Sequence, residues 1–227
     1  MKHITDIFFD LDHTLWDFDK NSEITYKIIF EELKIKVSLV DFLEAYTNIN
    51  KKLWKLFREE KIDKHTLRYK RLKDTFTEIS VVVSDEVLFE IADQYVYHLS
   101  RQIHLLDGTI KLLEYLKPKY TLHIITNGFA EVQEGKLNNT NLASYFDVIV
   151  NSEMAGVKKP NPIIFETALS LANVSKNNSL MIGDSFEADI LGALNFGIDA
   201  ICYNYHNEDL PSHIKYVNHL EELIHIL

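Results

Sequence analysis

Cysteine, glycine and proline are all scarce in this chain of 227 residues, and each scarcity excludes something. The single cysteine, Cys202, cannot form an intrachain disulfide, so nothing in the sequence indicates an oxidising compartment. Seven glycines and four prolines are too few for long disordered linkers. Neither residue type occurs from Met1 to Ile103, so helix boundaries in that part of the chain are hard to place.

Long apolar segments and positive charge are lacking as well. No uncharged apolar run approaches the roughly 20 residues that a membrane span needs, and the N-terminal run ending at Phe9 is too short and too acidic for a signal peptide. We therefore expect a soluble, cytoplasmic protein without a membrane partner. The formal net charge is −10, which argues against a nucleic-acid partner because a phosphate backbone would be repelled. A small phosphorylated substrate remains compatible, since a local cation can reverse the field.

Five short apolar runs are present, and most are continuous rather than alternating, which is typical of strands buried on both faces of a parallel sheet. They are Ile4–Phe9, Tyr120–Thr126, Phe146–Asn151, Leu180–Ile182 and Asp199–Asn204. Segments with helical spacing at Ala130–Leu142, Asn161–Ala172 and Phe186–Phe196 alternate with the later runs, and Leu220–Leu227 predicts a final helix. The pattern predicts an α/β fold with a doubly wound parallel sheet.

The segment between the first two runs has a different character. It is rich in Leu, Ile, Phe, Lys and Glu at helical spacing, its length fits four helices, and only Ser80–Ser84 resembles a strand. Because it interrupts the α/β pattern, it predicts an all-helical insertion. We expect residues 1–16 and 104–227 to form the core domain and residues 17–103 to form the insert.

Two carboxylates, Asp10 and Asp12, stand at the end of the first apolar run. Residues two apart in an extended strand point to the same side, and open α/β sheets bind ligands at the carboxyl ends of their strands. Two carboxylates held together need a cation or a shared proton. The alternative interpretation is that both residues only cap a loop, and the rest of the chain must decide between the two.

Polar residues follow the later runs in the same way. Thr126, Asn127 and Gly128 end the second run where a helix begins, and hydroxyl and N–H groups there suit an anion, although such a triplet is also a common turn. Lys159 precedes Pro160 at the start of the next predicted helix and is directed at the same strand ends, whereas Lys158 is interpreted as a surface residue.

Asp184 ends the fourth run, and Asp189 lies about one helical turn further on. Carboxylate oxygens of this kind suit Mg²⁺, which takes only a few protein ligands and keeps several waters. Asp189 is equally compatible with a helix surface, but we expect it to support the metal site from the second coordination layer.

The order of these motifs resembles the haloacid dehalogenase superfamily over essentially the whole chain. The resembling features are Asp-x-Asp-x-Thr, a strand-ending Thr-Asn-Gly, Lys-Pro before a helix, and Gly-Asp-Ser with a further aspartate. The resemblance implies a Rossmann-like core with a helical cap that selects substrates, and Mg²⁺ as cofactor. It implies the following roles: nucleophile, Asp10; general acid/base and backbone metal ligand, Asp12; phosphoryl binding, Thr126 and Lys159; metal ligand, Asp184; support of the metal, Asp189.

The acidic residue at position 12 predicts the reaction class within that superfamily. Its dehalogenases lack an acid there, whereas a phosphatase needs one because the leaving alkoxide must be protonated. We therefore expect a magnesium-dependent phosphomonoester hydrolase that forms an aspartyl-phosphate on Asp10. The alternatives are a phosphomutase of the same fold, or a non-catalytic binding protein on this scaffold, which the intact motifs disfavour.

The substrate is predicted from two shorter likenesses. The segments 50–54 and 125–129 resemble the bacterial pyrimidine 5′-nucleotidase branch, which implies a nucleoside monophosphate as substrate; a sugar phosphate is the alternative. Separately, we expect a monomer or weak homodimer. Trp54, Phe18 and Trp16 are candidates for stacking on a base, but core packing is an equal explanation for each. Asn127 and Gly128 are further candidates for substrate contact.

The remaining residues with reactive side chains receive plainer interpretations. The role of His13 stays open, because that position varies in the superfamily. Cys202 is interpreted as a buried small hydrophobic residue. No histidine shows zinc-ligand spacing, so the others are treated as structural or surface residues: His3, His65, His98, His104, His206, His213, His219 and His225.

Overall fold

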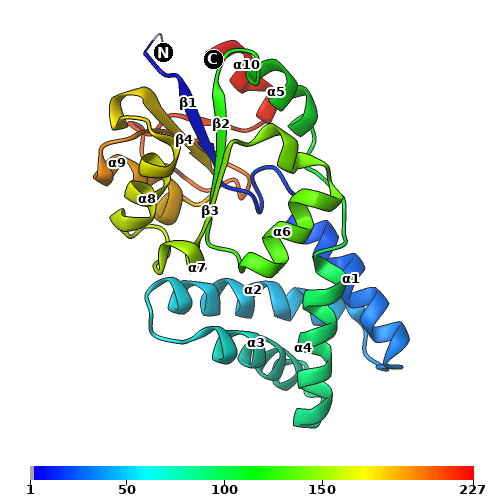
Figure 1. Cartoon of the computed structure of the whole chain (residues 1–227). Helices are drawn as coiled ribbons and strands as arrows, with labels where there is room; N and C mark the ends of the chain where they lie inside the picture. Colours follow the sequence, from blue (N-terminus) through cyan, green and yellow to red (C-terminus); the bar gives the residue numbers. More distant parts are fainter. Residues whose placement is uncertain (1–2) are drawn as a thin grey trace. The chain divides into compact units, whose positions relative to one another are not determined.

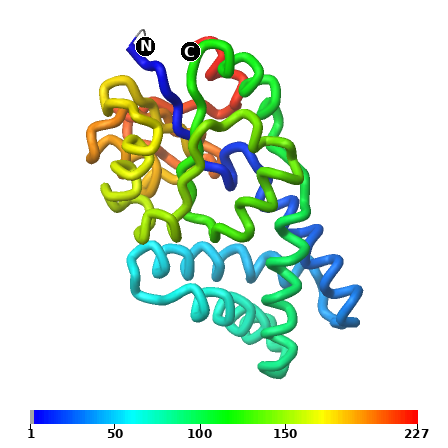
Figure 2. The backbone as a smooth tube through the Cα atoms, viewed as in Figure 1, coloured from blue at the N-terminus to red at the C-terminus, as the bar shows by residue number. Residues whose placement is uncertain are grey.

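The structure, a computed structural model, describes residues 3–227. The chain divides into two compact units. One unit contains the chain up to Asp19 together with Ile103–Leu227, and the other is Lys20–Gln102. The boundaries predicted from the sequence, after residues 16 and 103, lie close to these. Figure 2 shows the chain leaving the first unit early and returning to it after four helices.

The first unit is built on one sheet in which every neighbouring pair of strands is parallel. Its strands are β1 (Asp6–Phe9), β2 (Thr121–Thr126), β3 (Val148–Asn151), β4 (Ser179–Gly183), β5 (Asp199–Tyr203) and β6 (Tyr216–Val217). The strand order β3-β2-β1-β4-β5-β6 reverses direction at β1, as in doubly wound folds. The predicted fold class is therefore confirmed. The sixth strand was missed because two residues give no apolar run.

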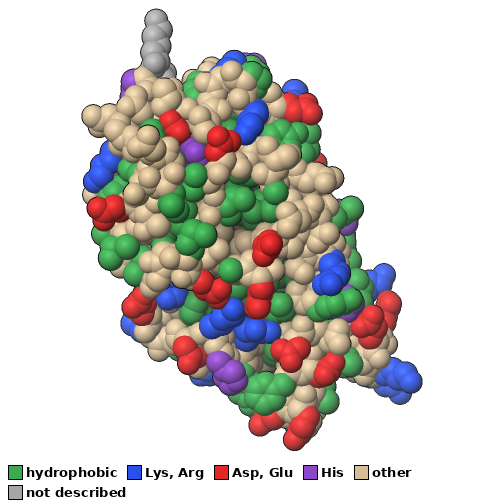
Figure 3. All heavy atoms as spheres, viewed as in Figure 1, with side chains coloured by type: hydrophobic (Ala, Val, Ile, Leu, Met, Phe, Trp, Pro, Cys, Tyr) green, Lys and Arg blue, Asp and Glu red, His purple; other side chains and the backbone are tan. Residues whose placement is uncertain are grey.

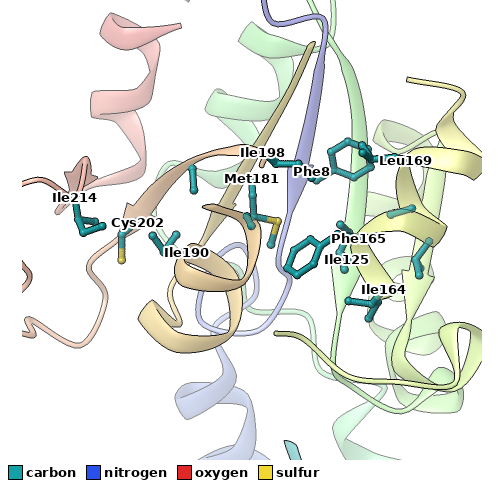
Figure 4. Packing of buried hydrophobic residues seen from close by; sticks show 14 residues of the cluster. Phe8, Ile125, Ile164, Phe165, Leu169, Met181, Ile190, Ile198, Cys202 and Ile214 are labelled. Carbon is teal, nitrogen blue, oxygen red and sulfur yellow. The ribbon is translucent and has the colours of Figure 1, made fainter. Parts of the chain in front are cut away.

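Helices cover both faces of this sheet (Figure 1). Figure 4 shows Phe8 of β1 and Met181 of β4 beside Phe165 of α8 (Pro162–Ala172), within a cluster that also contains Ala193 of α9 (Gly192–Phe196). The alternate residues of β1, Ile7 and Phe9, are also fully buried. Burial on both faces explains why these strands read as continuous apolar runs. Cys202 is buried in the same cluster, as predicted.

The other helices of this unit are shorter than predicted or were not predicted. The helix α6 (Ala130–Asn139) ends before the 3-10 turn Leu142–Tyr145, and the predicted helix 186–196 is a π-helix, Phe186–Leu191, followed by α9. The C-terminal segment is a 3-10 turn, Leu220–Glu222, and α10 (Leu223–Ile226). The helices α5 (Thr109–Leu116) and α7 (Ser152–Ala155) and the turn Lys176–Asn178 were not predicted.

The second unit contains the four predicted helices of the insert, except for the first turn of α1. They are α1 (Phe18–Glu32), α2 (Leu39–Arg58), α3 (Lys64–Glu78) and α4 (Asp85–Leu99). Without glycine, the turns after the first three helices use Lys34, Glu60 and Ser80 at φ of 54°, 58° and 58°. This left-handed backbone costs roughly 1–2 kcal/mol per residue for a side-chain-bearing residue. The segment Ser80–Ser84 was wrongly interpreted as strand-like: it is a turn and an irregular connection ending at Ser84, the N-cap of α4.

An aromatic cluster fills the interior of the insert. Tyr26 packs its ring against Phe42 and Tyr46 at centroid distances of 4.8 and 4.9 Å, and the buried Arg71 stacks on Tyr95. On the face of the insert visible in Figure 3, acidic and basic side chains lie intermixed. Among the described residues, no helix combines the length and the apolar character that crossing a bilayer requires.

Candidate active site

The strand register brings the predicted site residues to one edge of the sheet. Phe9 of β1 lies beside Ile124 of β2 and Ile182 of β4, so the residues that follow them meet at the same carboxyl end. Asp10 follows Phe9, and its backbone N–H donates to the Ile182 carbonyl at 2.9 Å. The site therefore forms where doubly wound sheets bind ligands.

Lys159 joins three elements of this site. Its side chain is 1% exposed, and Nζ lies 2.6 Å from Asp10 Oδ1 and 2.7 Å from Asp189 Oδ1. The same ammonium donates to the Ile125 carbonyl, so it contacts two carboxylates and one backbone oxygen. Asn127 fixes the Lys159 backbone, because its side-chain amide donates to the Lys159 carbonyl and accepts from the Lys159 N–H. A substrate contact by Asn127 stays a prediction.

The electrostatics of the site follow from burying several carboxylates together. Burial raises the pKa of Asp10 well above its ordinary value; Lys159 opposes this shift, and Asp189 and Asp184 add to it. Burial also raises the pKa of Asp189, against the pull of Lys159. Burial alone would lower the pKa of Lys159, but the two carboxylates beside it outweigh that effect and raise it.

The donor set of the site fits a hard divalent cation. Carboxylate oxygens of Asp10, Asp184 and Asp189 lie within 4.8 Å of one another, and burial together with the neighbouring carboxylates raises the pKa of Asp10 and Asp189. Thr14, from the first motif, donates to Asp184 Oδ1 at 3.2 Å. Oxygen ligands with partial charge compensation are what Mg²⁺ uses in proteins.

His206 belongs to this site although the sequence analysis treated it as a surface or structural residue. Its Nε2 lies 3.2 Å from Asp184 Oδ2. Burial opposes ionisation of Asp184, but the hydrogen bond from His206 and the charge of His13 outweigh it and lower the pKa of Asp184. The signal was available, because His206 comes shortly after β5 and parallel strands end at the same edge.

His13 lies beside these groups, with a backbone φ of 60° and its ring centroid 5.1 Å from that of His206. Its Nε2 is 2.9 Å from Asp19 Oδ1. Burial would lower the pKa of His13, but Asp19 and Asp184 outweigh it and raise the pKa. His13 therefore lies where neighbouring carboxylates favour its protonated form.

Two residues of α6, Gln133 and Lys136, also reach the site and were missed by the sequence analysis. Lys136 Nζ lies 2.6 Å from Asp12 Oδ1, and Gln133 Nε2 lies 3.0 Å from Asp12 Oδ2. Gln133 also donates to Thr126 Oγ1 at 2.7 Å. Their signal was weak: two polar residues three apart on a helix look like a solvated face, yet both are buried.

The aromatic candidates fall in different environments. Trp16 is fully buried, so base stacking by this residue is wrong and core packing is its role. Phe18 is half-buried, with Lys136 Nζ 5.6 Å from its ring centroid. Trp54 lies on α2 in the other unit and is half-buried. Gly128 leaves room for Gln133, since a Cβ there would lie 2.3 Å from Gln133 Cδ.

Comparison with known proteins identifies relatives along nearly the whole chain. A family model of haloacid dehalogenase-like hydrolases matches residues 7–203. The pyrimidine 5′-nucleotidase PynA of Streptococcus pneumoniae is 34% identical over 88% of this chain and 84% of its own length. The pyrimidine 5′-nucleotidase YjjG of Escherichia coli is 32% identical, over 97% and 96%. A glyceraldehyde 3-phosphate phosphatase of Pyrococcus furiosus is 32% identical, over 90% and 82%.

A solved structure agrees with these relatives. The HAD-hydrolase YfnB of Bacillus subtilis, bound to magnesium, superposes with a TM-score of 0.89 over 99% of both chains, at 29% identity. The fold, the motifs at the strand ends and the relatives together place the protein in one class. The chain belongs to the haloacid dehalogenase-like hydrolases, and the resemblance stated from its motifs is confirmed.

Proposed function

We propose that the protein is a magnesium-dependent phosphomonoester hydrolase, acting through an aspartyl-phosphate on Asp10. The observation that carries this proposal is the different surroundings of two carboxylates on one strand end. Asp10 is buried against Lys159, beside the carboxylates of Asp184 and Asp189. Asp12 keeps a side chain that is 24% exposed and is held by polar groups of α6. The surroundings of Asp10 suit a nucleophile, and those of Asp12 suit a group that donates and accepts a proton.

The reaction then proceeds in two steps. An Asp10 oxygen attacks phosphorus, the bond to the ester oxygen breaks, and Asp12 gives its proton to that departing oxygen. Asp12 next takes a proton from water, whose oxygen attacks phosphorus and releases inorganic phosphate and the Asp10 carboxylate. Lys159 and the Thr126 hydroxyl bind the phosphoryl oxygens throughout, which offsets the charge that gathers in the transition state.

The proposed cofactor is Mg²⁺, held by Asp10 and Asp184 and by the backbone carbonyl of Asp12. When bound, the metal neutralises phosphoryl charge and the mutual repulsion of the carboxylates. Asp189 supports the site by pairing with Lys159 and by accepting from the Ser185 backbone N–H at 3.0 Å. Magnesium in the related YfnB structure supports this assignment.

The proposed substrate is a nucleoside 5′-monophosphate, with a preference for pyrimidines. The support comes from the names of two relatives, PynA and YjjG, which match nearly the whole chain. A sugar phosphate is the second candidate, supported by the glyceraldehyde 3-phosphate phosphatase relative. The monomeric or weakly dimeric state and the cytoplasmic location stay predictions from the sequence.

Phosphate release from a matched set of substrates tests this function. The set contains pyrimidine and purine nucleoside 5′-monophosphates, glyceraldehyde 3-phosphate and 4-nitrophenyl phosphate, each with Mg²⁺ and with a chelator. The expected result is the highest kcat/KM for a pyrimidine nucleotide and no turnover with the chelator. The highest kcat/KM on glyceraldehyde 3-phosphate would mean that the substrate is a sugar phosphate and not a nucleotide. No turnover of any ester would favour a binding protein.

A further inference from the structure

Both carboxylate oxygens of Asp12 are occupied by side chains of one helix. Lys136 Nζ donates to Oδ1 at 2.6 Å, and Gln133 Nε2 donates to Oδ2 at 3.0 Å. The two donors are three residues apart on α6, so they project from one helix face. A carboxylate held at both oxygens by one rigid element has little freedom to rotate about its χ angles.

Gln133 extends this contact to the proposed phosphoryl-binding group. Its Nε2 also donates to Thr126 Oγ1 at 2.7 Å, so the same amide bridges Asp12 and Thr126. The side chain is 1% exposed and fills space that Gly128 leaves open. A Cβ at Gly128 would lie 2.3 Å from Gln133 Cδ and 2.4 Å from Nε2. The Thr-Asn-Gly turn therefore fits this glutamine closely.

Lys136, like Lys159, is almost entirely removed from solvent. Its side chain is 2% exposed, and Nζ lies 4.2 Å from the centroid of the buried Trp16 ring. A buried ammonium is costly unless it is paired, and an aromatic face and a carboxylate together compensate it. The need to keep this charge paired ties Asp12 to a fixed position.

We propose that Lys136 and Gln133 are positioning residues that hold the Asp12 carboxyl group in the geometry for proton transfer to the leaving oxygen. This inference rests on the function proposed above, in which Asp12 is the general acid and base. Both residues hydrogen-bond to the Asp12 carboxylate, so their effect on the leaving oxygen passes through Asp12. It should appear in kcat/KM, which covers the steps up to departure of the leaving group, and only where the leaving oxygen needs a proton, because the later attack of water is common to all substrates.

Leaving-group dependence gives a readout that a merely structural role would not move. Lys136→Met removes the charge but keeps an unbranched chain of similar length. We expect kcat/KM for a nucleoside monophosphate to fall by about tenfold or more, which is part of the roughly 100- to 10,000-fold that general acid–base catalysis contributes. On 4-nitrophenyl phosphate, whose leaving group needs no proton, we expect a loss of less than about threefold.

A double-mutant cycle shows whether the effect passes through Asp12. In an Asp12→Ala background, Lys136→Met should change kcat/KM for the nucleotide by less than about twofold, because the group it positions is gone. The matched control is Leu137→Ala on the same helix, which is 2% exposed. It should lower the melting temperature but depress both substrates equally.

The outcomes separate the two proposals. If Asp12→Ala depresses kcat/KM equally for both substrates, the role of Asp12 as general acid in the proposed function is wrong. If Asp12→Ala is selective for the nucleotide but Lys136→Met is unselective or additive with it, the positioning role is overturned. Gln133→Leu, which keeps the local charge unchanged, covers the case in which Lys136→Met does not fold. Because Gln133 also donates to Thr126, part of its loss falls on both substrates, but kcat/KM should fall further for the nucleotide, and an equal loss on both would overturn the proposal.

Discussion

Gly183 and Asp189 approach so closely that no side chain fits between them. A Cβ built on Gly183 would lie 2.3 Å from Asp189 Oδ2, an oxygen that accepts from the Ser185 backbone N–H. The end of β4 therefore packs directly against the π-helix that carries Asp189. π-Helical turns are frequent at functional sites. Here the turn holds a buried carboxylate 2.7 Å from Lys159 Nζ.

Gly183→Ala tests this close approach. We expect it to displace Asp189 and lower kcat/KM by about tenfold or more, corresponding to at least roughly 1.4 kcal/mol of transition-state stabilisation. Gly156→Ala is the control, because no atom lies within 4 Å of its Cβ position and only its φ of 72° is strained. The control should lose stability while keeping its activity. Phosphatase assays with thermal denaturation of both variants make the comparison, and full activity in Gly183→Ala would contradict it.

Metal binding should be visible without any assay of turnover. If Asp184 is a ligand of Mg²⁺, adding the ion should raise the melting temperature of the wild type, because a ligand that binds the folded state stabilises it. Asp184→Ala should abolish this rise and the activity. Glu187→Gln removes an exposed acid from the π-helix that follows Asp184, and it should keep both the magnesium-dependent rise and the activity. A magnesium-dependent rise that survives in Asp184→Ala would remove this residue from the metal site.

Most of the core and part of the site could be predicted from the sequence, for one physical reason. Parallel strands end at a common edge, so Asp10, Thr126 and Asp184 had to meet once their strands were recognised. Lys136 and Gln133 could not be placed in this way. Both lie on a helix face, and whether they point into the site depends on tertiary packing that periodicity does not encode.

Helix boundaries in the insert could not be predicted for a different reason. The helices there are followed by residues such as Lys34 and Glu60 in left-handed backbone conformations, where glycine usually marks the end. The strand-like appearance of Val81–Val83 came from side-chain type alone, and β-propensity depends on having a neighbouring strand. Among the described residues of the insert, none belongs to a strand.

Ionisation of the buried Asp10 carboxylate should lower the stability of the fold, although the proposed nucleophile needs the ionised form. Its pKa is raised above the ordinary value of 3.8, so the folded state holds this proton more tightly than the unfolded state does. That stabilisation is complete below the ordinary pKa and is lost as the pH rises through the raised pKa. Asp10→Asn cannot ionise, so it should not suffer this loss.

Melting curves of metal-free wild type and Asp10→Asn from about pH 4, near the ordinary pKa of aspartate, to neutral pH measure the effect. The melting temperature of Asp10→Asn should rise relative to that of the wild type as the pH rises. Its phosphatase activity should be abolished, because an amide cannot form the phosphoenzyme. A constant difference in melting temperature would contradict the raised pKa, and a residual rate above about a tenth would contradict the nucleophile.

Substrate choice is the least constrained part of the proposal, and Trp54 is the residue that tests it. Its ring lies edge-on to Phe57 at a centroid distance of 5.5 Å, and Phe57 is 6% exposed whereas Trp54 is half-buried. The two rings on one helix therefore differ in what they offer. An accessible indole can stack on a nucleotide base, whereas a buried phenyl ring contributes to packing.

Trp54→Ala should lower kcat/KM for nucleoside monophosphates by roughly 5- to 150-fold, which corresponds to about 1–3 kcal/mol of base stacking. A small phosphate ester without a base should be nearly unaffected. Phe57→Ala is the control, because it removes a buried ring from the same helix and should lower the melting temperature and depress both substrates together. If Trp54→Ala behaves like this control, with a uniform loss and a lower melting temperature, Trp54 is core and the base is recognised elsewhere. The assignments of Asp10, Asp12 and Lys159 would stand in either case, because they concern the phosphoryl group that every substrate shares.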